Sequence, residues 1–328
     1  MNPRLPCLAC ALLVLTGCAP LPVLKQNQSH ARFEFALIGD TPYNDFDATH
    51  SVPNMIAEIN RHRLAFVVHD GDIKSGSTPC TDEIFLQRRD LFNTILHPFI
   101  LIYGDNEWND CGKADKVEGA GDVYDPMERL QRLRGIFSSG HHSLGRRTMA
   151  LDRQSDEGAF PEFVEHVRWS YGGVVFAGLN IVGTGNNHGQ EEFDRRNRAT
   201  IAWLKSAFHE ARRTGARALM VVVQANPLFD KKPSDNARRG FNDFLDALEA
   251  ETIAFHRPVV LVHGDTHYFR IDKPMINRRT KRRVEHFTRL ETFGNPDVHW
   301  VRVAVDWRRP EVFTFHPEMV EANVIGDR

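Results

Sequence analysis

Four strand-like apolar segments of this chain end in the same dipeptide, Gly-Asp. They are FALIGD (35–40), FVVHDGD (66–72), FILIYGD (99–105) and LVHGD (261–265). Glycine lets the backbone turn sharply at the end of a strand, so the next side chain can project into the crevice that the loops form there. The pattern therefore predicts that four carboxylates meet at one place, those of Asp40, Asp72, Asp105 and Asp265. The alternative is that each aspartate only caps its own turn, which is a common use of this residue.

The order of apolar and amphipathic segments predicts an α/β fold. Strands are expected near 33–38, 64–69 and 98–103, with helices near 51–62 and 82–96 between them. Alternation of this kind is typical of βαβ units and a largely parallel sheet. Further along the chain the pattern predicts a hairpin at Gly172-Gly173, helices at 127–137, 190–213 and 240–251, and strands at 218–224, 284–292, 299–307 and 311–316. The last three alternate like antiparallel strands, so we expect one α/β domain in which two packed sheets are flanked by helices.

Composition narrows the class of protein. The chain has 328 residues, of which 41% are hydrophobic and 26% charged, as in soluble globular proteins. The formal net charge is −2, which gives no electrostatic basis for binding nucleic acid. The basic run NRRTKRR (277–283) is either a site for phosphate-rich or anionic partners or a solvated loop between strands.

The N-terminus has the features of an export signal. Arg4 precedes an apolar stretch from Leu5 to Leu15 that is too short to span a bilayer, and LTGC (15–18) follows. LTGC resembles the lipobox of bacterial lipoproteins, which implies a lipid on Cys18 and a membrane anchor; Ala19 is not the aspartate that favours inner-membrane retention. The prediction is an exported, periplasm-facing lipoprotein of the outer membrane. The alternative is an ordinary signal peptide with a chance cysteine.

Removal of the signal would leave two cysteines free to pair. Cys7 and Cys10 lie inside the signal, so only Cys80 and Cys111 remain beside the lipidated position. Cysteines of exported proteins usually form disulfides, and this bridge would tie together two of the loops that follow Gly-Asp. The alternative is a pair of buried free thiols.

The blocks as a set resemble the calcineurin-like metallophosphoesterases. That family carries Asp-x-His, Gly-Asp, Gly-Asn-His-Glu/Asp, a His-x-Pro strand end and Gly-His-x-His, and it uses two metal ions to hydrolyse phosphate esters. Asp40 corresponds to the first block, Asp72 to the aspartate that bridges the metals, and Trp203-Leu204 to a pair that ends a helix before the fourth block. The resemblance divides the chain into a signal peptide (1–18), a tether (19–32), a phosphoesterase domain (33–316) and a C-terminal tail (317–328).

The third and fifth blocks match with substitutions. In GDNE (104–107), Asp105 takes a ligand position and Asn106 takes the position of the family's catalytic histidine. In GDTH (264–267), His267 corresponds to the second histidine, while Asp265 replaces the first.

Two ligand histidines of the family are missing altogether. Pro42 stands where the first block has histidine, and Ala225 stands where the fourth block has it. The remaining set of four aspartates and one histidine is harder than usual, which favours Mn²⁺ or Mg²⁺ over Zn²⁺, Fe or Ca²⁺. The site is expected to hold one or two ions.

Other polar residues could complete the site. His263, two positions before Asp265, is either an extra ligand or a buried supporting histidine, and Tyr43 is expected to pack rather than to coordinate. The loop GNNHG (185–189) offers three side chains to a substrate phosphate or forms a polar turn: Asn186, Asn187 and His188. Leaving-group protonation is assigned to His188, Glu107 or water, and Asn106 would donate a hydrogen bond to phosphate.

The resemblance implies a metal-dependent hydrolase of small phosphate esters in which metal-bound hydroxide attacks phosphorus in line. Motifs of other enzyme classes are missing: the sequence has no G-x-S-x-G, Walker A, H-E-x-x-H or dinucleotide-binding pattern. The alternative is a lipoprotein of the same fold that has lost catalysis and acts by binding or as a scaffold. The sequence predicts neither the substrate nor the oligomeric state.

Overall fold

The structure is a computed structural model that describes Met1, residues 31–113 and residues 123–324. The predicted signal peptide after Met1, the lipidated Cys18 and nearly all of the tether lie outside the described residues. Among the helices of the described segments, none combines the length and the apolar character that crossing a membrane requires.

Two mixed β-sheets form the centre of the molecule, which confirms the expected architecture. The first sheet contains, in spatial order, β12 (Phe313–Glu318), β11 (Trp300–Asp306), β1 (Arg32–Ile38), β2 (Val67–His69) and β3 (Phe99–Leu101). The second contains β4 (Asp152–Arg153), β5 (Val167–Tyr171), β6 (Val174–Gly178), β7 (Ala218–Val222), β8 (Val259–His263), β10 (Phe287–Glu291) and β9 (Arg270–Asp272). The strands β1, β2 and β3 are parallel to one another, as are β6, β7, β8 and β10. Their carboxyl ends therefore gather at one edge of each sheet.

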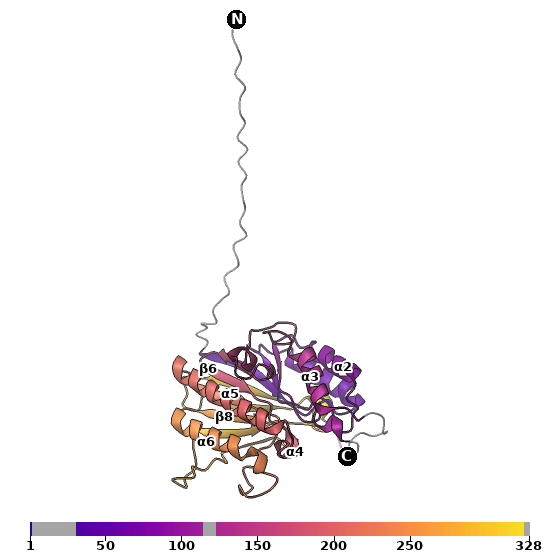
Figure 1. The fold of residues 1–328 in the computed structure, drawn as a ribbon. Coiled ribbons are helices and arrows are strands. Elements are labelled where there is room, and N and C mark those ends of the chain that lie inside the picture. The colour runs from indigo at the N-terminus through magenta and orange to yellow at the C-terminus, as the bar shows by residue number, and fades with distance from the viewer. Residues whose placement is uncertain (2–30, 114–122, 325–328) are drawn as a thin grey trace.

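Helices cover the outer faces of both sheets. The helices are α1 (Val52–Ile59), α2 (Asp82–Phe92), α3 (Pro126–Phe137), the short α4 (Gly183–Asn186), α5 (Phe193–Thr214) and α6 (Asn242–Phe255). Figure 1 shows α5 and α6 side by side on one flank of the molecule, with α2 and α3 grouped on another. Shorter helical turns occupy Asp47–Ser51, Asp110–Gly112, Gln154–Glu157, Arg239–Phe241 and Glu321–Asn323.

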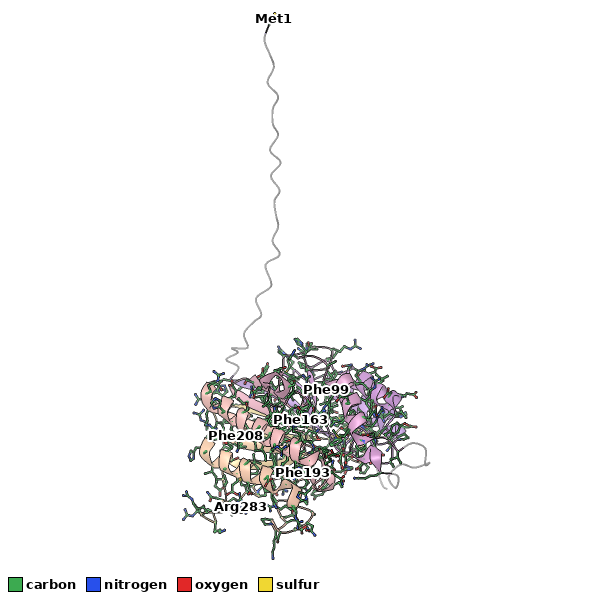
Figure 2. The ribbon with its side chains drawn as sticks, in the orientation of Figure 1. Met1, Phe99, Phe163, Phe193, Phe208 and Arg283 are labelled. Carbon is green, nitrogen blue, oxygen red and sulfur yellow. A yellow bond between two sulfur atoms is a disulfide. The ribbon has the colours of Figure 1, made fainter. Side chains whose placement is uncertain are left out.

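An aromatic layer joins the two sheets. Phe35 of β1 and Phe66, which directly precedes β2, pack on Phe176 of the second sheet, and Trp169 stacks on Phe176 with ring centroids 5.2 Å apart. Separate apolar clusters lie between the first sheet and its helices and between the second sheet and α5 and α6. In Figure 2, Phe208 and Phe193 mark two points along α5, and the buried Phe208 belongs to the second of these clusters. The packed sheets form a rigid base for the loops at their carboxyl ends.

Local sequence signals set the element boundaries. The Asp125 side chain caps α3 by accepting hydrogen bonds from the backbone N–H groups of Met127 (2.7 Å) and Glu128 (3.1 Å), and Pro126 opens the helix. The hairpin between β5 and β6 turns at Gly172 and Gly173, whose φ angles of 52° and 79° suit glycine.

The tail of the chain differs from the expectation in one strand. The segments 299–307 and 311–316 do form an antiparallel pair, β11 and β12, and β12 runs to Glu318, two residues into the predicted tail. The segment 284–292 instead contains β10, which lies in the other sheet and runs parallel to β8. Alternating polarity indicates which face of a strand is buried, but it does not determine strand direction.

Candidate metal centre

The four Gly-Asp loops meet at the carboxyl ends of β1, β2, β3 and β8. The backbone N–H of Asp265 donates to both carboxylate oxygens of Asp40 at 3.1 Å. The backbone N–H of Asn106, next to Asp105, donates to Asp72 Oδ1 at 3.1 Å. Asp40, Asp72 and Asp105 are almost fully buried, so their carboxyl groups face one another rather than bulk water.

The backbone at this edge adopts conformations that are rare outside glycine. The φ angle is 47° at Asp40, 60° at Asp72, 80° at Asp265 and 60° at His267. Such left-handed residues cluster where a structure holds side chains for binding or catalysis. The sharp turns bring side chains from separate strands toward a common region.

The glycines that precede the aspartates allow close approach between loops. A Cβ atom at Gly264 would overlap the Asp40 carboxylate, and a Cβ at Gly104 would overlap the Asp72 carboxylate. Each of these Gly-Asp pairs thus places its own aspartate and makes room for the aspartate of another loop.

Tyr43 lies at the centre of one side of the cluster, contrary to the expectation that it only packs. Its hydroxyl oxygen is 3.1 Å from Asp72 Oδ2, 3.5 Å from Asp40 Oδ1, 3.1 Å from His267 Nε2 and 3.0 Å from Asn106 Nδ2. Burial, followed by the charges of Asp72 and Asp40, raises the pKa of the Tyr43 phenol well above its ordinary value. We call Asp40, Tyr43, Asp72 and His267 the Tyr43 side.

His267 presents one ring nitrogen to this group. Its Nδ1 lies 2.5 Å from the carbonyl oxygen of Asn295, so Nδ1–H is the donor in that contact. In the neutral ring Nε2 is then left with its lone pair, directed toward Tyr43 and, at 3.5 Å, Asp40 Oδ1.

The other side of the cluster contains Asp105 and Asp265, which we call the Asp105 side. Thr184 Oγ1 donates to Asp105 Oδ2 at 3.2 Å, and the backbone N–H of Asn226 donates to Asp265 Oδ2 at 2.9 Å. Burial and the charge of Asp110 raise the pKa of Asp105 to about 6, and burial and the charge of Asp105 raise the pKa of Asp265 to about 7. The two carboxylates therefore interact although the protein joins them by no direct hydrogen bond.

The remaining aspartates show the same crowding of negative charge. Burial and the charge of Asp70 raise the pKa of Asp40 well above its ordinary value. Burial and the charges of Asp105 and Glu107 do the same to Asp72. Like charges at this spacing favour either protonation or a compensating cation.

One buried cation lies beside the cluster, and no motif in the sequence points to it. Lys74 is fully buried, and its ammonium donates to the carbonyl oxygen of Ser75 at 2.8 Å. Burial lowers the pKa of Lys74 to about 8, against the opposing charges of Glu107, Asp72 and others. A single ammonium balances only a fraction of the carboxylate charge.

Asn106 and Glu107, the predicted catalytic residues, both form hydrogen bonds that hold the loops of the cluster together. The Asn106 amide nitrogen donates to Asp72 Oδ2 at 2.9 Å and to Tyr43 Oη at 3.0 Å, so both of its hydrogens are used within the site. Glu107 is fully buried, and its Oε1 accepts from the N–H groups of Gly104 (2.8 Å) and Asp72 (3.2 Å). Burial raises the pKa of Glu107 to about 7.

The GNNHG loop is oriented differently from the expectation. Asn186 is buried, donates to the carbonyl of Gly240 at 3.0 Å and accepts from Arg196 at 2.6 Å. Asn187 donates to Glu192 at 3.0 Å and lines a cavity of about 510 Å³. His188 is exposed and packs edge-to-face on Phe193.

Thr184, just before that loop, contacts the cluster instead. His188 forms no hydrogen bond to the aspartates within the described part of the chain. A hydroxyl at the start of the loop is a weaker sequence signal than two adjacent asparagines, which explains why Thr184 was missed.

His263 lies apart from the carboxylates of the centre. It is fully buried on β8, its Nδ1 is 2.8 Å from the carbonyl oxygen of Gly264, and its Nε2 is 4.0 Å from Glu291. Burial lowers its pKa to about 3. These contacts are those of a buried supporting histidine, the alternative to a metal ligand.

The expected disulfide between Cys80 and Cys111 is present. It links residues 31 positions apart, and both sulfur atoms lie 3.8 Å from the carbonyl oxygen of Asn106. The bridge therefore fixes the loop that carries Asp105 and Asn106 against the loop that follows Asp72. The basic run lies in an exposed segment, in which Arg278 pairs with Asp246 and Glu249 of α6, and Figure 2 places Arg283 at the rim of the molecule.

The oxygen-rich set of side chains in the cluster suits a hard cation. In this structure, hydrogen bonds within the protein already use several of these oxygen atoms. Across the described ranges, no group of three or more His, Cys, Asp and Glu side chains could hold a metal ion as placed. Asp72 Oδ2 accepts hydrogen bonds from Tyr43, Asn106 and Gln224. The set is nonetheless four mutually repelling carboxylates, and Glu107 Oε2 is a buried oxygen without a hydrogen-bond partner among the described residues. Oxygen ligands of this kind suit Mn²⁺ and Mg²⁺.

Comparison with known proteins gives structural similarities only. No family model and no curated protein matches the sequence. PhoD superposes with a TM-score of 0.49 and 12% identity, over 84% of this chain and 64% of PhoD. GAP50, described as the anchor in the inner membrane complex of Plasmodium, gives 0.48 and 11%, over 88% of this chain and 89% of GAP50. The purple acid phosphatase from yellow lupin (Lupinus luteus) gives 0.47 and 10%, over 87% of this chain and 53% of the lupin enzyme.

Proposed function

We propose that this protein is a divalent-metal-dependent hydrolase of small phosphate esters. The observation that carries the proposal is the meeting of Asp40, Asp72, Asp105 and Asp265 at the carboxyl ends of strands from both sheets. Their mutual repulsion and the left-handed backbone of three of them are features of a binding centre rather than of four independent turns.

A bound divalent cation would supply Lewis acidity toward a phosphoryl oxygen and acidify a water molecule. The residues of the chain would hold and orient that centre. Asp72 is central because its charge acts on both sides, and the amides of Asn106 and Gln224 fix its Oδ2 at 2.9 and 3.1 Å. The Asn295 carbonyl sets the ring orientation of His267, a supporting contact that is general for ligand histidines.

The charge around the centre bears on which cation it would take. Four carboxylates and one imidazole, with no cysteine among the described residues beyond the disulfide pair, make a hard donor set, for which we infer Mn²⁺ or Mg²⁺ rather than Zn²⁺. The buried Lys74 lowers the net negative charge, and we infer that it weakens binding of a second ion relative to the first.

We further infer that the protein works outside the cytoplasm, attached to a membrane through Cys18. The lipobox-like LTGC is the sequence basis of this inference. The Cys80–Cys111 disulfide supports it, because such bridges persist mainly in oxidising compartments.

A metal add-back assay tests the proposed function. Purified protein is stripped with a chelator and assayed on aryl phosphate monoesters and diesters, with Mn²⁺, Mg²⁺, Zn²⁺ and Ca²⁺ added in turn. We expect turnover that stops on chelation and returns best with Mn²⁺ or Mg²⁺. A folded protein that hydrolyses none of these esters with any ion would overturn the proposal and point to a binding or scaffold role.

A further inference from the structure

The edge of the molecule opposite the carboxylate cluster carries many basic side chains. It is the edge at which the parallel strands begin. Arg32 opens β1 and lies opposite Asp306, the last residue of the antiparallel β11, so the turn after β11 is at this edge as well. The parallel register of β1 and β2 places Arg63, four residues before β2, at the same edge. Arg32, Arg63 and Arg309 line one hollow of about 530 Å³ there.

The second sheet continues this basic surface. Arg217 directly precedes β7, and its guanidinium lies 5.1 Å from the ring centroid of Trp307, which follows β11. This contact joins the edges of the two sheets. The basic run 277–283 lies in the connection from β9 to β10, and β10 begins beside the first residue of β8. Figure 2 shows Arg283 of this run at the rim of the molecule.

Most of the positive charge at this edge has no acidic partner. Three guanidinium groups share the carboxylate of Asp306, with Nε of Arg32 at 2.7 Å, Nε of Arg308 at 2.9 Å and Nε of Arg309 at 3.9 Å. Five further exposed cations pair with no carboxylate of the described ranges: Arg63, Arg217, Arg279, Lys281 and Arg282. Apart from Asp306, the exposed acids of these segments are Glu285 and Glu311. We define the basic edge as Arg32, Arg63, Arg217, Arg308, Arg309 and the run 277–283.

The proposed lipid anchor leads directly to the basic edge. Cys18 precedes Arg32 by 14 residues, and a chain of that length reaches at most about 50 Å when fully extended. Strand β1 then runs away from the anchor, and Asp40 lies about 26 Å beyond Arg32 at the usual strand spacing. That separation is about three times the Debye length at physiological salt. The negative charge of the cluster therefore does not cancel the attraction of the basic edge for an anionic surface.

We propose that the basic edge docks on the negatively charged surface of the anchoring bilayer, with the carboxylate cluster facing the surrounding water. Each arginine or lysine that reaches an anionic lipid surface increases binding about 5-fold. The anchor makes the contact intramolecular, so a surface of modest affinity stays docked. This inference rests on the proposed lipidation of Cys18 and on the proposed metal centre. It narrows the substrates to phosphate esters dissolved in water, as distinct from those embedded in the same membrane.

Sedimentation with vesicles tests the surface separately from the lipid anchor. The protein used is the chain from residue 19 onward, made without lipid, which retains both sheets and all three apolar clusters of the described residues. We expect it to bind vesicles of phosphatidylglycerol mixed with phosphatidylcholine, to be released as salt is raised, and not to bind phosphatidylcholine alone. Equal binding to the two kinds of vesicle, or binding to neither, would overturn the proposal.

Matched removals of charge locate the contact. Arg63→Gln combined with Arg282→Gln removes one exposed cation beside each sheet, and binding to the anionic vesicles should weaken at least about 10-fold. The control, Lys231→Gln combined with Lys232→Gln, removes two exposed cations from the loop that follows the carboxyl end of β7. We expect less than about a 2-fold change in the control. Equal losses in the two variants would show that only net charge matters and would overturn the docking surface.

Trp307 gives a second readout that needs no substitution. The other four tryptophans of the chain are buried, whereas Trp307 is half-buried at the turn that carries Arg308 and Arg309. Anionic vesicles that carry a fluorescence quencher on their headgroups should therefore reduce its emission. Unchanged emission from vesicle-bound protein would overturn the proposed orientation.

The outcomes separate this inference from the proposals on which it rests. Hydrolysis of a dissolved aryl phosphate should be the same with and without bound vesicles, and its loss on vesicle binding would show that the cluster faces the membrane. Vesicle binding through the basic edge by a protein without ester hydrolysis would support the docking surface and overturn the hydrolase. Tighter binding to duplex DNA than to the anionic vesicles would overturn the bilayer as the partner. Mature protein without lipid on Cys18 would overturn the anchor alone.

Discussion

The two sides of the carboxylate cluster are held together in different ways. On the Tyr43 side, side chains touch directly, with Tyr43 Oη within 3.5 Å of Asp40, Asp72 and His267. On the Asp105 side, Asp105 and Asp265 are connected through their charges and are positioned by Thr184 and by the backbone of Asn226. Preorganised donors bind an ion with less rearrangement than donors that repel across a gap. If the proposed ion binds, this difference favours the Tyr43 side as its first position.

Apart from replacement of Asp72, the largest loss of turnover is expected when an added methyl group crowds the Tyr43 side. Gly264→Ala puts a methyl group into the space of the Asp40 carboxylate, so Asp40 must move. Misplacement of about 1 Å can reduce turnover about 100-fold, and we expect a loss of that size in the aryl phosphate assay. Gly135→Ala in α3, where a Cβ meets no atom within 4 Å, is the control and should retain activity. Full activity in Gly264→Ala would show that the position of Asp40 is not critical.

Removing the buried ammonium of Lys74 should change both the stability of the metal-free protein and its affinity for Mn²⁺. Lys74→Met deletes the ammonium that offsets the charges of Glu107, Asp72 and Asp105. We expect the metal-free variant to unfold at lower temperature and to bind Mn²⁺ about 10-fold more tightly in calorimetric titration, because more negative charge is left uncompensated. The exposed Lys205 of α5, changed to Met, provides the control. Weaker Mn²⁺ binding by Lys74→Met would contradict this electrostatic picture.

The Asp105 side should have a distinct pH dependence. The pKa of Asp265 is raised to about 7, so the metal-free folded protein binds more protons than the unfolded chain between about pH 4 and pH 7. Asp265 therefore destabilises the fold progressively as pH rises through this window. In denaturant unfolding with a chelator present, Asp265→Asn should gain stability relative to the parent from pH 4 to pH 7 and then level off. A difference that is flat across this range would indicate that Asp265 ionises normally.

The smallest effect on turnover is expected from the disulfide. Cys80→Ser combined with Cys111→Ser removes a link between residues 31 positions apart and should lower the free energy of unfolding by about 3–4 kcal/mol. Because Asn106 keeps its hydrogen bonds to Asp72 and Tyr43, turnover below the melting temperature should fall less than about 3-fold. A much larger loss of turnover would mean that the disulfide is needed to position the Tyr43 side and the Asp105 side relative to each other.

The sequence was sufficient for the parallel strands of the first half and for the dipeptides that bring aspartates together. Gly-Asp at a strand end is a local signal, and parallel strands place such ends at one edge. The direction of β10 was not predictable, because the pattern of polar and apolar residues along a strand does not determine the direction in which the strand pairs.

The residues that sequence reasoning misplaced lie in turns. Tyr43 follows Asp40, whose φ of 47° redirects the chain, and the side-chain direction after such a turn cannot be counted from a strand period. No sequence motif singled out Lys74, and only its full burial identifies it as part of the centre. In the GNNHG loop, Asn187 at a φ of 54° turns its amide toward Glu192.

The most direct test of the account is the turnover of Asp72→Asn beside that of the parent protein, both at saturating Mn²⁺. Asp72 belongs to the Tyr43 side, and the charge of Asp105 on the other side acts on it. Asparagine keeps the shape of the side chain and removes its charge. We predict a loss of at least about 1000-fold in aryl phosphate hydrolysis, with the variant still folded. Parent-level turnover in Asp72→Asn would contradict the claim that these four loops form a catalytic metal centre.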